Sequence, residues 1–151
     1  MKKRIITLLI IIFILNLIWE FSHFPLYIDL SWENSTLHLI YATFGDLLLI
    51  SIIFTIISLK NKTINWINKS SIFDYILITF LGIIIAVFIE LRAFVENKWE
   101  YTQYMPTIFS IGLTPLIQLA VTGILSLLIL NFIFKQKQKV KQPHTTKSNL
   151  L

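Results

Sequence analysis

The sequence predicts an all-α fold, a four-helix transmembrane bundle with up-down antiparallel topology. The first observation is composition, because 56% of the residues are hydrophobic, 14% are charged and the mean hydropathy is +0.75. The second is that four stretches reach the length of about 20 mostly apolar residues that crosses a bilayer. The third is that the three loops between them are short, which makes consecutive helices antiparallel neighbours. A chain of 151 residues leaves no room for a second soluble domain.

The transmembrane domain is expected to cover residues 1–134, followed by a basic cytoplasmic tail over residues 135–151. In order, the spans are predicted at residues 5–24, 37–59, 73–95 and 107–134. The first span has the basic start and apolar run of a signal peptide, but no cleavage site of small residues follows it, so we expect a retained helix. The tail is polar, which is typical of a disordered or surface-associated segment.

The basic residues predict the orientation of the bundle. All but two of the 13 lysine and arginine residues precede the first span, lie in the second loop or follow the fourth span. These regions fall on one side of an even-numbered bundle, and the other side carries only Arg92 and Lys98. The positive-inside rule therefore predicts a multi-pass protein of the cell membrane with both termini in the cytoplasm.

Ionisable residues inside the predicted spans are the main candidates for function. Such groups are costly in hydrocarbon and normally face a bundle interior or a wet cavity. We expect the catalytic or acid–base residues among Asp46, His38, Glu90 and Glu20. All four lie in the half of the bundle that faces away from the cytoplasm.

A helical rise of about 1.5 Å per residue gives the depth of each candidate. Counted this way, Glu20, His23, His38 and Glu90 form an outer layer, and Asn16, Asp46 and Gln118 form a second layer near the midplane. His38 and Asp46 are eight residues apart, or about 12 Å along the helix axis, so no direct hydrogen bond joins them. Asp46 has to find its partner on another helix.

Each span carries one stripe of polar or small residues, and burying the four stripes together would satisfy them. Such stripes are most often packing surfaces and interhelical hydrogen bonds, which is one interpretation of Gln118 and Asn16; substrate binding is the other. Pro115 is expected to loosen the backbone near Gln118. The stripes consist of Asn16, Glu20 and His23; His38, Tyr41, Ala42, Gly45 and Asp46; Gly82, Ala86 and Glu90; and Thr114, Gln118, Thr122 and Ser126.

The loop before the fourth span contains the dense aromatic and polar run 99–106. Together with His23, Asn16 and Gln118, its residues Trp99 and Tyr101 are candidates for substrate binding, as a lid or rim above the acidic layer. A plain interfacial anchor is the alternative for this run. Arg92 is expected to pair with Glu96 four residues later.

Other chemistries are weaker. A metal site from Glu20, His23, His38 and Glu90 is the alternative use of the outer layer, but di-iron bundles use two Glu-x-x-His motifs and this chain has one. No cofactor is therefore favoured, and a divalent metal stays the alternative. The chain has no cysteine and no Gly-x-Ser-x-Gly, which excludes a thiol nucleophile and disfavours a serine hydrolase. Without a basic groove or an aromatic nucleic-acid motif, we expect no nucleic-acid partner.

Ordered motifs along most of the chain carry a resemblance to a family. They are Asn16-x-x-Trp19-Glu20-x-x-His23-x-x-Leu26-Tyr27, His38-x-x-x-Ala42-x-x-Gly45-Asp46, Trp99-x-Tyr101-x-x-x-Met105-Pro106 and Gly112-x-x-Pro115-x-x-Gln118. This pattern resembles a group of small four-span prokaryotic membrane proteins whose function is uncharacterised. The resemblance extends to about the end of the fourth span and implies no activity, substrate or cofactor.

Two functional classes remain open. One is a membrane-embedded enzyme or binder for a lipid or isoprenoid-like substrate, in which Asp46 or Glu90 exchanges a proton and His38 assists. The other is a small ion, proton or solute transport component, or a structural subunit, which implies a homo-oligomer or a larger membrane complex. Membrane lipids are expected partners in both.

Overall fold

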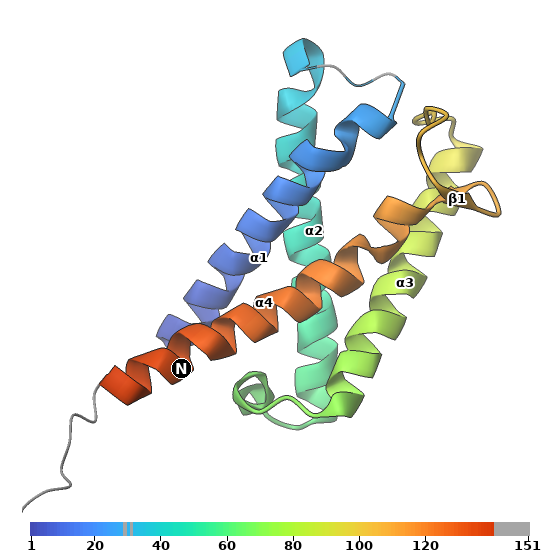
Figure 1. Cartoon of the computed structure of the whole chain (residues 1–151). Coiled ribbons are helices and arrows are strands. Elements are labelled where there is room, and N and C mark those ends of the chain that lie inside the picture. Colours follow the sequence, from blue (N-terminus) through green and yellow to red (C-terminus); the bar gives the residue numbers. More distant parts are fainter. Residues whose placement is uncertain (29, 31, 141–151) are drawn as a thin grey trace, which may run out of the picture.

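The computed structural model describes residues 1–28, 30 and 32–140 of the chain. Four long helices dominate it, and two short 3₁₀-helices and a two-stranded antiparallel hairpin lie in the loops (Figure 1). The helices are α1 (Lys2–His23), α2 (Trp32–Lys60), α3 (Ile72–Val95) and α4 (Leu113–Val140), with η1 (Phe24–Leu26), η2 (Ile64–Asn68), β1 (Thr107–Ile108) and β2 (Ile111–Gly112) between them. The predicted all-α four-helix bundle is confirmed.

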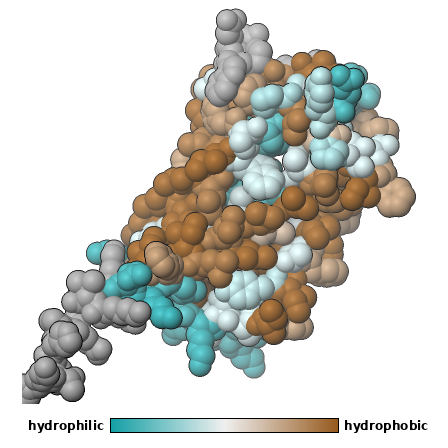
Figure 2. Space-filling model, in the orientation of Figure 1, coloured by the Kyte–Doolittle hydropathy of each residue, from teal (hydrophilic) through white to brown (hydrophobic). Residues whose placement is uncertain are grey.

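Each of the four helices is long and apolar enough to cross a membrane. In α1 the exposed face is apolar and the buried face is partly polar, which is the reverse of a soluble helix. Figure 2 shows a broad hydrophobic band across the middle of the visible face, with hydrophilic residues gathered toward the ends. The chain is thus a multi-pass integral membrane protein. The α1 residues that illustrate this are exposed Ile6, Ile10, Ile14 and Ile18, and buried Asn16, Glu20 and His23.

Consecutive helices run antiparallel, and their loops define two ends of the bundle. We call the end formed by the start of α1, η2 and the last turns of α4 the basic end, and the end formed by residues 24–28, 30 and 96–112 the aromatic end. At the basic end Arg4 donates a hydrogen bond to the side chain of Asn68 and lies 4.5 Å from the ring centre of Phe134. At the aromatic end the backbone of Ile28 donates to Glu100, at 3.0 Å. Each end is therefore joined by contacts between segments distant in sequence.

The helices do not enclose a uniform core. α4 packs along both α1 and α3, and α1 packs along α2, whereas α2 contacts α3 much less (Figure 1). The half near the basic end is filled by aliphatic side chains that are fully buried. The half near the aromatic end contains the buried polar residues Glu20, Glu90 and Gln118. The residues that fill the first half include Ile12, Ile50, Ile53, Ile57, Ile78, Leu127 and Leu130.

The predicted fourth span, 107–134, differs from the structure at its start. Residues 107–112 form the β1–β2 hairpin, in which Phe109 and Ser110 adopt positive φ angles of 51° and 66° to make the turn. Helix α4 begins only at Leu113, so Pro115 falls in the first turn, where its missing N–H is not needed. Pro115 therefore starts the helix and does not loosen it.

The other boundaries differ less. Helix α4 continues to Val140 because its lysines and glutamines are good helix formers, so the predicted tail begins within a helix. Residues 141–151 of that tail lie outside the described part of the chain. Helix α2 begins at Trp32, before the expected Leu37. Helix α3 begins at a capping box, in which Ser71 and Asp74 exchange side-chain-to-backbone hydrogen bonds.

The small-residue stripe of α3 allows a close approach of α4. A Cβ atom added at Gly82 would lie 3.0 Å from the backbone nitrogen of Ala120 on α4. The same addition at Gly45 on α2 would meet nothing within 4 Å. The two glycines thus occupy opposite environments within one bundle.

A matched pair of substitutions tests this difference. We expect Gly82→Ala to lower the free energy of unfolding by about 1–3 kcal/mol, because the α4 backbone has to move. Gly45→Ala should leave it unchanged or raise it by up to about 1 kcal/mol, since alanine favours a helix. Thermal unfolding of both variants in detergent micelles measures the two effects. Equal effects of the two substitutions would contradict the packing described.

Candidate functional site

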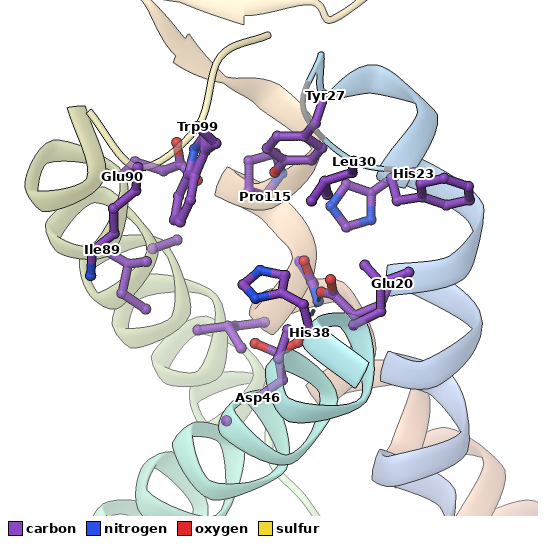
Figure 3. A pocket seen from close by; sticks show the side chains of 18 of the residues that line it. Glu20, His23, Tyr27, Leu30, His38, Asp46, Ile89, Glu90, Trp99 and Pro115 are labelled. Atoms are coloured by element: carbon purple, nitrogen blue, oxygen red, sulfur yellow. Dashed lines mark hydrogen bonds between the residues drawn. The ribbon is translucent and has the colours of Figure 1, made fainter. Parts of the chain in front are cut away.

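A cavity of about 560 Å³ lies in the half of the bundle near the aromatic end (Figure 3). All four helices and both flanking loops contribute to its wall. Its polar and charged lining consists of Glu20, His23, Tyr27, Ser35, His38, Asp46, Glu90, Lys98, Trp99 and Gln118. The apolar lining includes Phe24, Leu30, Leu39, Ala42, Leu49, Ala86, Ile89, Pro115 and Leu119.

A single amide nitrogen joins two carboxyl groups on the wall of this cavity. The Gln118 Nε2 atom donates to Glu20 Oε1 and to Asp46 Oδ2, and both distances are 2.6 Å. The three residues come from α4, α1 and α2. Asp46 thus finds its partner on another helix, as expected, and Gln118 serves the site as well as helix packing. We call Glu20, Gln118 and Asp46 the acid cluster.

The acid cluster corrects the predicted separation of Glu20 and Asp46 into two layers. Side chains of an α-helix tilt toward its N-terminus. In α1 this direction points Glu20 toward the basic end, and in the antiparallel α2 it points Asp46 toward the aromatic end. Counting the rise of Cα atoms ignored these opposite tilts, which bring the two carboxyl groups to one level.

The acid cluster has no cationic partner in the described part of the chain. The salt bridges found there join Lys60 to Asp74, and both Arg92 and Lys98 to Glu96. The predicted Arg92–Glu96 pair is confirmed, with 2.6 Å between Nε and Oε1. Hydrogen bonds from Lys98 and from Arg92 hold the pKa of Glu96 below its ordinary value. Lys98 borders the cavity, yet its ammonium group is engaged by Glu96.

The two candidate histidines occupy different places. His23 is buried, and its Nδ1 atom lies 2.7 Å from the carbonyl oxygen of Trp19. Because a carbonyl only accepts, Nδ1 carries the proton, and in the neutral ring Nε2 is an acceptor. His38 is exposed on α2 and borders the cavity at its edge. Both rings point into the cavity in Figure 3.

The opposite wall is built by Glu90 on α3 and the loop that follows it. The Tyr101 hydroxyl donates to Glu90 Oε2, and the Trp99 indole N–H lies 3.4 Å from the Tyr101 oxygen. Tyr101 does not line the cavity, but it pairs with Tyr27 in an isolated antiparallel bridge. Trp99 does line it, and its ring lies 6.2 Å from that of Tyr27 in an edge-to-face arrangement. Tyr101 therefore positions the wall, and Trp99 and Tyr27 form its surface.

The cavity is open to the side, between α2 and α3. Four of its lining residues are exposed: His38 and Gly45 on α2, Ile89 on α3, and Lys98 in the loop after α3. The space beside Gly45 is empty, and these two helices contact each other little. In a bilayer this opening faces lipid.

Of the predicted site residues, the structure brings Glu20, His23, His38, Asp46, Glu90, Trp99 and Gln118 to this cavity. Asn16 does not line it: its Oδ1 accepts from Thr122 at 3.1 Å and its Nδ2 donates to the Ile12 carbonyl, so it joins α1 to α4. As for the predicted metal alternative, no three His, Asp or Glu side chains within the described ranges are grouped to hold a metal ion.

Sequence reasoning did not identify Leu30 and Lys98 as cavity residues, and it included Tyr27 only as part of a motif. They lie in the loops, where helical periodicity gives no information about facing. The aromatic residues of both loops were a usable signal, because their placement at the same end allows them to meet.

We expect Gln118→Leu to destabilise the bundle by about 1–3 kcal/mol, because it leaves two buried carboxyl groups without their shared donor. Adding Asp46→Asn should recover part of this loss, with a coupling of about 0.5–3 kcal/mol in the double-mutant cycle. Thermal unfolding in micelles gives the four values, and Gln136→Leu, on an exposed turn of the same helix, is the control. Additive effects would show that the bond between Gln118 and Asp46 contributes nothing.

Tyr101 provides a test by pH. Burial, followed by its hydrogen bond to Glu90, raises the pKa of Tyr101 to about 12. A raised tyrosine pKa favours the neutral form in the folded state, so its contribution to stability is complete below pH of about 10 and is lost as the pH rises toward 12. Phenolate absorbance of wild type minus Tyr101→Phe isolates this group. A midpoint near pH 10 for the difference would contradict the bond.

In comparisons of sequence and of structure, no family model, no curated protein and no solved structure matches the chain. The resemblance to small four-span prokaryotic membrane proteins therefore stays a prediction. The function has to be argued from the cavity itself.

Proposed function

We propose that the cavity binds a lipid- or isoprenoid-like molecule, which arrives from the membrane between α2 and α3. The observation that carries the proposal is the combination of a side opening toward lipid with a buried acid cluster at the wall of the cavity. A molecule dissolved in the bilayer would reach this site without crossing water. Its polar end would meet Glu20, Gln118 and Asp46.

The apolar lining supports an amphipathic ligand. Leu39, Leu49, Ile89 and Leu119 surround the path from the opening to the acid cluster, and they offer contact to a hydrocarbon chain. Pockets for small molecules are usually lined in this way, with a few polar groups that fix the orientation. The volume of about 560 Å³ lies within the usual range for such pockets, about 300–1,000 Å³.

The chemistry that these side chains offer is proton exchange. Carboxyl groups and a neutral histidine are the usual general acids and bases, and all of them line the same cavity here. The acid cluster and His38 would be the groups that exchange a proton with the bound molecule. Glu90 is held by Tyr101 on the opposite wall and would contribute as a second acid.

The filled half of the bundle favours binding over transport. The half of the bundle near the basic end is filled by fully buried side chains such as Ile12, Ile50 and Leu127, which close the cavity on that side. With the basic end in the cytoplasm, as the distribution of lysine and arginine predicts, the cavity belongs to the outer half of the membrane. An association of several copies stays a prediction.

The proposal is tested by the lipids that copurify with the protein. We expect wild-type protein, extracted in a mild detergent, to retain a lipid-like molecule detected by mass spectrometry. Asp46→Asn and His38→Ala should each reduce its amount at least threefold relative to protein, because both change the lining of the cavity.

A matched pair tests the opening. Gly45→Phe fills the empty space between α2 and α3, whereas Leu48→Phe places the same ring on an exposed position of α2 outside the cavity lining. Only Gly45→Phe should lower the retained amount, and similar thermal unfolding of both variants excludes misfolding. Identical lipid content in wild type and all four variants would overturn the proposal.

A further inference from the structure

The acid cluster keeps hydrogen-bonding capacity that Gln118 does not use. Each carboxylate has two oxygens, and Gln118 contacts one oxygen of Glu20 and one of Asp46. A glutamine amide has two N–H donors and one carbonyl oxygen. The Gln118 nitrogen donates to both carboxyl groups. The remaining hydrogen-bonding atom of this side chain is therefore its carbonyl oxygen, an acceptor.

His23, which is not part of the acid cluster, adds a hydrogen-bond acceptor to the same cavity. Its ring is buried, with 8% of its surface exposed, and its Nδ1–H is engaged by the Trp19 carbonyl. In the neutral ring the remaining atom, Nε2, presents a lone pair. No hydrogen-bond partner of Nε2 is found among the residues that the structure describes, and the ring points into the cavity (Figure 3).

The ionisable side chains that line the cavity include three carboxyl groups without a cationic partner among the described residues. Glu20, Asp46 and Glu90 line it, and their hydrogen-bond donors, Gln118 and Tyr101, are neutral. Lys98 is the lining residue with a cationic group, and its Nζ lies 2.8 Å from Glu96 Oε2. A carboxyl group in an apolar surrounding is strongly stabilised by a cation that also donates hydrogen bonds.

The aromatic wall is compatible with a cation as well. Tyr27 and Trp99 line the cavity above the acid cluster, with ring planes at 86° to each other. Aromatic faces attract ammonium groups, by about 0.5–2 kcal/mol per contact. The two rings thus form a corner that suits a small cation.

We infer that the polar end of the bound molecule is a protonated amine, which donates to Glu20, Asp46 and His23. This inference rests on the proposed function, because it names the class of amphipathic molecule that the cavity takes. A phosphate or carboxylate head group would meet carboxyl oxygens at the acid cluster, with no cation from the described part of the chain beside them to bind it. A hydroxyl head group would offer only one hydrogen-bond donor to these residues, and it carries no positive charge.

Three chemically matched probes test the head group. Dodecylamine, dodecanol and dodecyl phosphate share one chain, and native mass spectrometry of the full chain in dodecyl maltoside counts each adduct in competition. We expect the amine adduct to exceed each of the others at least tenfold on the wild type. Asp46→Asn and Glu20→Gln should reduce this preference to less than threefold while the dodecanol adduct persists, which shows that the cavity is still formed.

Glu100→Gln is the control, since it removes an exposed carboxylate outside the cavity lining, and it should retain the full preference for the amine. Binding of dodecanol or dodecyl phosphate at the level of the amine on the wild type would overturn the head-group inference alone. An amine preference that survives both cavity substitutions would also overturn it. Absence of all three adducts from the wild type would instead contradict the proposed function.

Discussion

The shared hydrogen-bond donor Gln118 is the interaction on which the outer part of this bundle depends. Its amide nitrogen joins Glu20 of α1 and Asp46 of α2 to α4, at 2.6 Å in each case. Elsewhere α2 and α4 contact each other little, so this bond is a principal link between them. Two carboxyl groups buried in a membrane protein need donors, and one amide supplies both. The position of α2 relative to the rest of the bundle is thereby coupled to the state of the acid cluster.

The antiparallel topology explains why the three side chains meet. Tilting of side chains toward the helix N-terminus moves Glu20 and Asp46 in opposite directions along the membrane normal. Parallel helices carrying the same residues would keep them apart. The same topology divides the bundle into a half filled by aliphatic side chains and a half that contains the cavity. The filled half holds the helices at fixed spacing, so that the other half can stay open between α2 and α3.

Much of the fold was predictable, because the membrane imposes strong rules on composition and length. Four apolar segments and short loops were sufficient for the architecture, but the stripe of Gly82 and Ala86 did not show which helix approaches it. The hairpin at residues 107–112 was not predictable in this way, since its apolar residues resemble the start of a span. It depends on two positive φ angles, at Phe109 and Ser110, that no composition rule reveals.

The sequence predicted which residues line the candidate site better than it predicted how their side chains are arranged. Intramembrane charge alone selected Glu20, His38, Asp46 and Glu90, and all four line the cavity. Their pairing depended on side-chain direction, which a count of helical rise does not include. Asn16 was predicted as a site residue but does not line the cavity. It lies in the same stripe as Glu20, but its hydrogen bond with Thr122 joins α1 to α4. Residues of the loops, such as Tyr27, lack any periodicity that would have placed them.

The central claim is that the space between α2 and α3 is the site of a membrane-derived molecule. A crystal structure of the protein purified with its native lipids measures this most directly. The account predicts elongated density that passes Gly45 and ends within hydrogen-bonding distance of Glu20 or Asp46. A structure in which α2 and α3 close on each other over their full length, with the acid cluster sealed by side chains, would contradict it.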